Sequence, residues 1–197
     1  MAAARGAGVV AQQVTHAGQR RFWTDSMQTM FGRLKADPSL SLYEVLDKAA
    51  LCRVFFDVEY DRSANPDRPA SADEAVAVAL LAHTDRFLAA DGLCCDTSGM
   101  WVLDASSDSK FSQHIVLPVA GAGYLGSVAQ VGQLVTRVAA SVVAEMPEVF
   151  LAAKLGRFEP VCVVDVSVYN TNQQFRVAYS SKLGQVRPLL PFKSSSM

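Results

Sequence analysis

The sequence has few cysteines and histidines, and their spacing argues against two common ways of stabilising or equipping a small protein. Its four cysteines form no CxxC pair, and its three histidines do not follow them at zinc-ligand spacing. We therefore expect neither a zinc ion nor a disulfide framework in this chain, and we favour a reducing compartment. The cysteines concerned are Cys52, Cys94, Cys95 and Cys162.

Long apolar runs are also absent. No run approaches the roughly 18 residues that would span a bilayer, because even the stretch 131–143 is interrupted by polar residues. We therefore expect no membrane partner. With 197 residues, half of them hydrophobic, the chain is long enough to bury its own core.

A large excess of charge of either sign is missing, since 18 basic residues face 19 acidic ones and the net charge is -1. This balance argues against nucleic-acid binding through bulk positive charge. The charges are nevertheless uneven: six acids fall between Asp57 and Glu74, whereas no acid follows Asp165. One region is suited to cations and another to phosphates, although ordinary solvated faces would give the same pattern.

The N-terminal segment has no continuous apolar core of the kind that signal peptides carry. It has three arginines and no acid before Asp25, which is compatible with mitochondrial import or with a flexible tail. We expect a flexible segment over 1–19, one catalytic domain over 20–190 and a tail over 191–197.

Hydrophobic patterning predicts a mixed α/β fold. The β-branched and aromatic run 52–60 predicts a buried strand, and the polar stretch 61–72 predicts a loop after it. Ser71, with Glu74 three residues later, resembles a capping box and predicts a helix that stops near Gly92. Further elements are predicted as a hairpin over 100–104 and 110–116, a helix over 127–144, and strands over 161–169 and 175–180.

Asp57 and Glu59 are two residues apart on the predicted strand 52–60, so side-chain alternation places both carboxylates on one face. Two like charges on one face need a cation, a proton or a basic partner, and a divalent metal ion suits hard oxygen ligands. The pair therefore indicates a metal site, with an exposed strand end as the alternative.

Asp165 lies within the apolar run 161–166, where an unpaired buried charge would cost several kcal/mol. If its strand lies beside that of Asp57, three carboxylates converge as ligands for two metal ions about 4 Å apart, which serve an in-line phosphoryl displacement. The alternative is a structural aspartate paired with Arg53 or Arg176.

Lys110, Ser112 and His114 alternate along the predicted strand 110–116, so all three polar groups share a face. An ammonium, a hydroxyl and an imidazole together suit a nucleotide triphosphate, although a lone histidine is more often structural. The stretches 169–176 and 180–184 are polar and basic without acids, and they suit phosphate or template contact or a solvated hairpin.

Taken in order, four segments resemble the eukaryotic primase-polymerases of the archaeo-eukaryotic primase superfamily. The order of a DxE pair, an SxH pair and a later strand aspartate is specific to the superfamily, and the last segment is typical of this branch. The segments are 42–60, 110–115, 164–169 and 172–184, the last containing Phe175-Arg176 and Ser181-Lys182.

This resemblance implies an α+β catalytic core with a mixed sheet of RNA-recognition-motif type and flanking helices. It implies that Asp57, Glu59 and Asp165 are the catalytic metal ligands, with two Mn²⁺ or Mg²⁺ ions as cofactor. It also implies that the incoming triphosphate contacts Lys110, Ser112, His114, Arg176 and Lys182, with Arg20 or Arg21 as a further contact.

The activity implied is that of a DNA-directed primase/polymerase, a nucleotidyltransferase that joins dNTP or NTP to a primer 3′-OH on a single-stranded DNA template. Such enzymes act in lesion bypass and replication restart. The expected partners are template, primer and a single-stranded-DNA-binding protein. We expect a monomer in the nucleus or the mitochondrial matrix.

The chain departs from the family pattern in three ways. Gln173 stands where a basic residue is expected, the interval from His114 to Asp165 is short, and no cysteine-histidine zinc module precedes Met197. We therefore expect primer extension rather than initiation, and a trimmed second module. Two alternatives stay open: a shortened, non-catalytic relative that binds single-stranded DNA, and a metal-dependent phosphoesterase that uses the same carboxylates.

Overall fold

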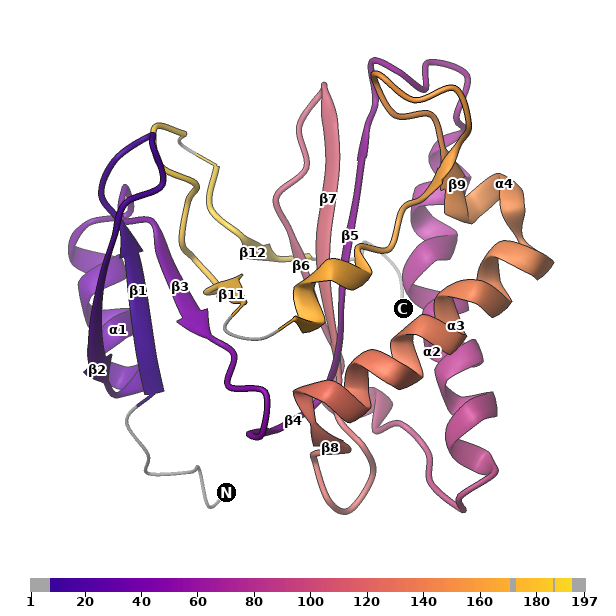
Figure 1. Cartoon of the computed structure of the whole chain (residues 1–197), viewed down its shortest axis with the longest axis horizontal. Helices are drawn as coiled ribbons and strands as arrows, with labels where there is room; N and C mark the ends of the chain where they lie inside the picture. Colours follow the sequence, from indigo (N-terminus) through magenta and orange to yellow (C-terminus); the bar gives the residue numbers. More distant parts are fainter. Residues whose placement is uncertain (1–7, 171–172, 186, 193–197) are drawn as a thin grey trace. The chain divides into compact units, whose positions relative to one another are not determined.

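The computed structural model describes residues 8–170, 173–185 and 187–192 (Figure 1). Helices alternate with antiparallel strands along the chain, which confirms the mixed α/β (α+β) class expected from the sequence. None of the helices in the described ranges is long and apolar enough to cross a membrane.

The chain divides into two compact units, whereas the sequence led us to expect one domain over 20–190. The first unit contains the described residues up to Asp47 and those from Gln173 to Pro191, and the second contains Lys48–Asn170 with Phe192. The units arise because the chain leaves the first sheet after β3 (Leu42–Val45) and returns to it with β11 (Gln174–Arg176), more than a hundred residues later. A return of this kind does not change the amino-acid composition at the unit boundaries, so two units could not be predicted from composition.

The first unit is a four-stranded antiparallel sheet with one helix. The strand order is β11-β3-β1-β2, and helix α1 packs Met30 and Leu34 against Val10, Leu42 and Val177. Ser26 caps α1 by accepting a hydrogen bond from the N–H of Thr29. The elements are β1 (Gly8–Gln13), β2 (Arg20–Asp25), α1 (Met27–Ala36), β3 (Leu42–Val45), β11 (Gln174–Arg176) and β12 (Leu190–Pro191).

The expectation of a flexible segment over 1–19 is wrong for its second part. Residues 8–13 form β1, which pairs with β2 on one side and β3 on the other. Val10 and Ala11 are buried there, so a central strand begins within a segment whose small residues suggested a tail. Residues 1–7, and 193–197 of the expected tail, lie outside the described ranges.

The second unit packs an antiparallel sheet, in the order β6-β7-β5, against helices α2 and α3, which lie on the same side of the sheet (Figure 1). The even positions of β5 are buried and the odd positions face the other way. The elements are β4 (Leu51–Cys52), β5 (Val54–Asp61), α2 (Ala70–Ala89), η1 (Thr97–Gly99), β6 (Trp101–Asp104), β7 (Lys110–Leu117), β8 (Gly126–Ser127), α3 (Val128–Glu145), α4 (Pro147–Phe150), β9 (Leu151–Ala152), β10 (Val161–Cys162) and η2 (Val166–Tyr169).

Several predicted elements of this unit are confirmed: the strand at 52–60, the hairpin of β6 and β7, and the helix after Ser127. The prediction of a capping box at Ser71 and Glu74 is wrong. Helix α2 already begins at Ala70, after Pro69, whose fixed φ suits a helix start, and no side chain caps it. The capping box of this unit lies at α3, between Ser127 and Gln130.

The predicted strand over 161–169 is also wrong beyond its first residues. Strand β10 ends at Cys162, and residues 166–169 form the 3-10 helix η2. The chain turns because the carboxylate of Asp165 accepts a hydrogen bond from the N–H of Ser167 and so favours a cap over a continued strand. Likewise, β11 ends at Arg176 rather than Ser180, and Tyr179 adopts a left-handed φ of 70°.

Candidate active site on the β5–β7 face

The register of β5 and β7 places three acids opposite three polar or basic side chains on one face of the sheet. The odd positions of β5 carry the acids, because the even positions point toward the helices. Direct cross-strand partners have neighbouring Cβ atoms, so each acid has a polar neighbour. The pairs are Asp57 with His114, Glu59 with Ser112, and Asp61 with Lys110.

Asp165 joins this face from a different part of the chain. Its N–H donates to the carbonyl of Asp57 at 2.8 Å, and the N–H of Glu59 donates to the carbonyl of Val163 at 2.9 Å. Val58 and Val164 form the bridge between these two bonds. The segment 163–165 therefore runs antiparallel beside β5, which is the adjacency that convergence of the three carboxylates requires.

The surroundings of Asp165 differ from the expected buried strand interior. The residue is half-buried and caps η2, with one carboxylate oxygen accepting from the N–H of Ser167 at 2.8 Å. No ion pair of Asp165 is found within the described ranges, and Arg53 lies over the ring of Tyr124 instead. The structural ion pair with Arg53 is therefore not formed.

Two acids of β5 contact side chains of β7. The ammonium of Lys110 lies 2.6 Å from Oε2 of Glu59, and Nε2 of His114 lies 3.6 Å from Oδ1 of Asp57. Asp57 and Glu59 keep 19% and 36% of their side-chain surface exposed, so both remain accessible to small ions. As the side chains lie, no group of three or more His, Cys, Asp or Glu residues within the described ranges is arranged to hold a metal ion.

Tyr169 fixes η2 against β5. Its hydroxyl donates to the carbonyl of Phe55, and the two rings lie 4.8 Å apart. Burial raises the pKa of Tyr169 well above its usual value, and the nearby charges of Asp57 and Asp165 raise it further. The tyrosine therefore stays neutral and fixes the end of the segment that carries Asp165.

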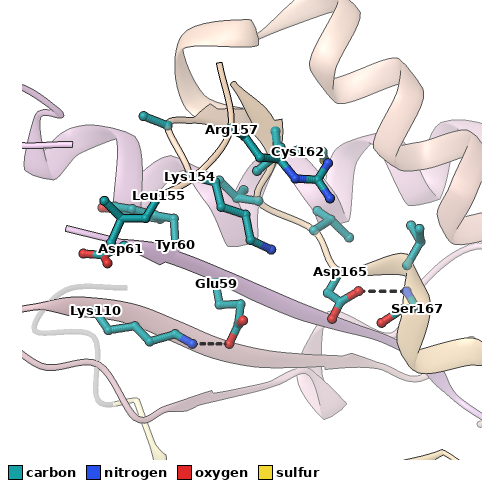
Figure 2. Close-up of a pocket in the computed structure, with 15 residues that line it drawn as sticks. Glu59, Tyr60, Asp61, Lys110, Lys154, Leu155, Arg157, Cys162, Asp165 and Ser167 are labelled. Carbon is teal, nitrogen blue, oxygen red and sulfur yellow. Dashed lines mark hydrogen bonds and ion pairs between the residues drawn. The ribbon is translucent and has the colours of Figure 1, made fainter. Parts of the chain in front are cut away.

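A pocket of about 700 Å³ opens beside the carboxylates. Figure 2 shows Glu59 and Asp165 on one side of it and the Lys154 side chain directed toward them from the β9–β10 loop, which also contributes Arg157 to the lining. The pKa of Asp61, which also lines the pocket, is lowered chiefly by a hydrogen bond from Ser63. The pocket thus brings acidic and basic side chains together.

The remaining predicted triphosphate contacts belong to the first unit. Arg176 is buried in β11, opposite Tyr43 of β3, and Lys182 lies half-buried in the segment that follows. Arg20 and Arg21 lie in β2 of the same unit. The structure therefore gathers Asp57, Glu59, Asp165, Lys110, Ser112 and His114 on one face of the second unit, with Arg176 and Lys182 belonging to the other unit.

Sequence reasoning missed three pocket residues: Asp61, Lys154 and Arg157. Asp61 continues the i, i+2, i+4 alternation of Asp57 and Glu59, so the strand pattern contained its signal. Lys154 and Arg157 lie in a short basic segment with no motif, and only the fold brings that segment to the pocket.

The fold and the site define a class: a mixed α/β protein with acidic and basic side chains interleaved on one sheet face. The chain is similar to proteins named DNA-directed primase/polymerase protein, with 26% identity over 214 residues to that of Mus musculus and 24% over 201 residues to that of Danio rerio. These alignments cover 85% and 86% of this chain. The protein of the same name from Homo sapiens is 35% identical over 79 residues, covering 39% of this chain and 13% of the human protein.

These relatives confirm the resemblance to primase-polymerases that the four sequence segments carry, at a distant level of identity. The chain spans 39% and 38% of the lengths of the mouse and zebrafish relatives, or about two fifths. No protein-family model matches the chain.

Proposed function

We propose that this chain is the polymerising core of a DNA-directed primase/polymerase, a nucleotidyltransferase that joins dNTP or NTP to a primer 3′-OH on a single-stranded DNA template. The observation that carries the proposal is the register in which segment 163–165 lies beside β5. It sets Asp165 next to Asp57 and Glu59 on the face that also carries Lys110 and the buried side chains of Ser112 and His114.

The proposed cofactor is a pair of Mn²⁺ or Mg²⁺ ions held by Asp57, Glu59 and Asp165. The donor set fits, because all three ligands are carboxylates, the hard oxygen donors that these ions prefer. A backbone hydrogen bond joins Asp57 to Asp165, and Glu59 lies two residues from Asp57 on the same face, so the three ligands start from neighbouring backbone positions. When bound, the ions would activate the attacking hydroxyl and stabilise charge in the phosphoryl transition state.

The residues of β7 have complementary roles in this proposal. Lys110 supplies a point charge for a phosphate, and Ser112 and His114 supply directional hydrogen bonds. The ammonium of Lys110 forms an ion pair with Glu59. A bound triphosphate would attract this ammonium and so free the Glu59 carboxylate to bind a metal ion. Arg176 and Lys182 are proposed as further triphosphate contacts on the sequence resemblance alone.

The biological setting belongs to the same proposal. The names of the relatives describe DNA-directed enzymes, which supports a DNA template and primer as partners of this chain. Lesion bypass and replication restart, a single-stranded-DNA-binding protein as partner, a monomeric state, and the nucleus or mitochondrial matrix as location are proposed from the resemblance.

A second candidate function is metal-independent binding of single-stranded DNA without catalysis. The observation that favours it is the ion pair between Glu59 and Lys110, which balances the charge of that acid without a metal ion. A phosphoesterase that uses the same carboxylates is the third candidate, and it would shorten the primer when nucleotides are withheld.

Primer extension on a single-stranded template with Mn²⁺ or Mg²⁺ tests the proposal. The double variant Asp57→Ala/Glu59→Ala should lose extension while keeping DNA binding. The matched control Glu74→Ala/Asp108→Ala removes two exposed acids from α2 and the β6–β7 turn and should extend normally. Extension by the Asp57→Ala/Glu59→Ala variant at the wild-type rate would refute metal-dependent catalysis at this face.

A further inference from the structure

The β9–β10 loop, residues 153–160, combines two basic side chains with an exposed aromatic ring. Lys154 and Arg157 are exposed, and neither has an ion pair or side-chain hydrogen bond within the described ranges. Phe158, next to Arg157, is fully exposed, and Leu155 is 73% exposed. Glu159 is the single acid of the loop, so the loop carries a net positive charge.

The base of this loop is fixed by the loop between β5 and α2. The side-chain amide of Asn65 donates to the carbonyl of Ala153 at 3.0 Å and accepts from the N–H of Ala153 at 2.8 Å. The guanidinium of Arg68 donates to the carbonyl of Leu151 at 3.1 Å. These hydrogen bonds therefore fix the backbone where the loop begins, and the exposed residues follow directly after this fixed position.

The loop also borders the carboxylate pocket. Lys154 and Arg157 line it together with Glu59 and Asp165, and Figure 2 shows the Lys154 side chain directed toward these two acids. Exposed cations beside a fully exposed aromatic ring are typical of surfaces that bind single-stranded nucleic acid, where cations contact phosphates and rings stack on bases.

We propose that the β9–β10 loop binds the single-stranded DNA that enters the carboxylate pocket. Lys154 and Arg157 contact successive phosphates, and Phe158 stacks on an unpaired base. This inference rests on the proposed function for the identity of the strand, and it adds a binding element outside the residues expected from the sequence. A triphosphate alone would account for the two cations but gives no reason for a fully exposed ring at Phe158.

Binding of a fluorescent single-stranded oligonucleotide, measured by anisotropy in EDTA, tests the loop without metal or catalysis. Phe158→Ala should weaken binding by about 5-fold or more, because stacking on an aromatic side chain contributes roughly 1–3 kcal/mol per base. Phe158→Tyr should bind like the wild type, and Phe158→Leu, which keeps bulk without a π-face, should bind like Phe158→Ala.

The salt dependence separates phosphate contacts from stacking. Lys154→Ala/Arg157→Ala should make the slope of log K against log salt shallower by about 1.4, since each phosphate contact contributes roughly 0.7 on single strands. Phe158→Ala should leave the slope unchanged. Arg137→Ala removes one cation from α3, where the guanidinium lies over Phe87, and should change neither affinity nor slope beyond the effect of net charge.

Wild-type affinity and salt slope in both Lys154→Ala/Arg157→Ala and Phe158→Ala would overturn the proposal. A raised KM for dNTP with unchanged DNA affinity would also overturn it, because it would assign the cations to the triphosphate. The Asp57→Ala/Glu59→Ala variant separates the two proposals. If that variant still extends primers, catalysis at the carboxylates fails, whereas the loop proposal is judged by DNA binding alone.

Discussion

Asp57 and Asp165 are neighbours on one face of the second unit, since the N–H of Asp165 donates to the carbonyl of Asp57 at 2.8 Å. One acid comes from the middle of a long strand and the other from the cap of a 3-10 helix. Two carboxylates side by side repel each other unless a cation or a basic group lies between or beside them. Substitution of Asp165 is therefore the most direct test of a metal site on this face.

Asp165→Asn should abolish catalysis while preserving the fold. Asparagine keeps the capping of Ser167, because its side-chain oxygen accepts the same hydrogen bond, but it removes the charge that a divalent ion needs. We expect primer extension to fall about 100-fold or more, since a ligand of the reacting metal is lost. Steady-state extension rates and the free energy of unfolding measure the two effects.

Asp165→Ala is the companion variant, because it removes both charge and cap. It should lose activity to the same extent and in addition lose about 1 kcal/mol of stability. If Asp165→Asn retained extension while Asp165→Ala lost it, the residue would be acting through the cap, and the ligand role would be refuted.

Lys110→Met should have opposite effects on metal and nucleotide binding. Its ammonium lies 2.6 Å from Glu59, so its removal frees that carboxylate for a cation, and Mn²⁺ binding should tighten by up to about 5-fold, the upper range for a half-exposed ion pair. The KM for dNTP should rise, because a phosphate contact is lost. Calorimetric Mn²⁺ titration and extension kinetics measure both.

Lys48→Met, an exposed lysine at the start of the second unit, serves as the charge control for Lys110→Met and should change neither quantity. A weaker affinity of Lys110→Met for Mn²⁺ would contradict competition between the ammonium and the metal for Glu59.

Gly132→Ala should destabilise the second unit although alanine is the better helix former. A Cβ at position 132 would lie 2.7 Å from Cβ of Tyr169, which is close to the backbone of η2 and cannot rotate away. The helix-propensity gain is about 1 kcal/mol, whereas overpacking costs roughly 1–3 kcal/mol, so we expect a net loss. Denaturant unfolding measures it.

Gly32→Ala in α1 is the matched control, because a Cβ there meets no atom within 4 Å. It should stabilise the chain by up to about 1 kcal/mol. Stabilisation by Gly132→Ala of the same size would show that η2 is not packed against α3 as described.

The parts of the site that the sequence predicted are those carried by strand alternation. The i, i+2 spacing of Asp57 and Glu59, and of Lys110, Ser112 and His114, was sufficient to predict which side chains share a face. Which acid of β5 lies opposite which residue of β7 follows from the register, and that register depends on contacts between strands far apart in the chain.

Asp165 shows where sequence reasoning reached its limit. Its apolar neighbours predicted a strand interior, but an aspartate side chain competes with the strand ladder for the N–H two residues later, and the local bond to Ser167 prevailed. The adjacency to Asp57 was only a condition of the sequence argument, and the structure meets it. The β9–β10 loop was not foreseen, because nothing in a short basic segment indicates which pocket it will border.

A partly buried network around Asp73 connects the end of β5 to the start of α2. Asp73 accepts a hydrogen bond from the hydroxyl of Tyr60 at 2.5 Å and forms an ion pair with Arg62 at 2.9 Å. Arg68 lies 3.6 Å from the same carboxylate, and its guanidinium stacks over the Tyr60 ring. Burial, reinforced by the bond to Asp73, raises the pKa of Tyr60 to about 12.

This shift predicts a stability change at high pH. An unfolded tyrosine ionises near pH 10, so the native state alone keeps the Tyr60 proton between about pH 10 and 12. The contribution of Tyr60 is therefore fully present below pH 10 and is lost as the pH rises through about 12. Ultraviolet titration should show phenolate formation near pH 12 whose amplitude is smaller by one tyrosine in Tyr60→Phe, and part of which moves to lower pH in Asp73→Asn. Tyr124→Phe, which alters an exposed ring, should leave the amplitude near pH 12 unchanged, and an unchanged amplitude in Tyr60→Phe would contradict the assignment.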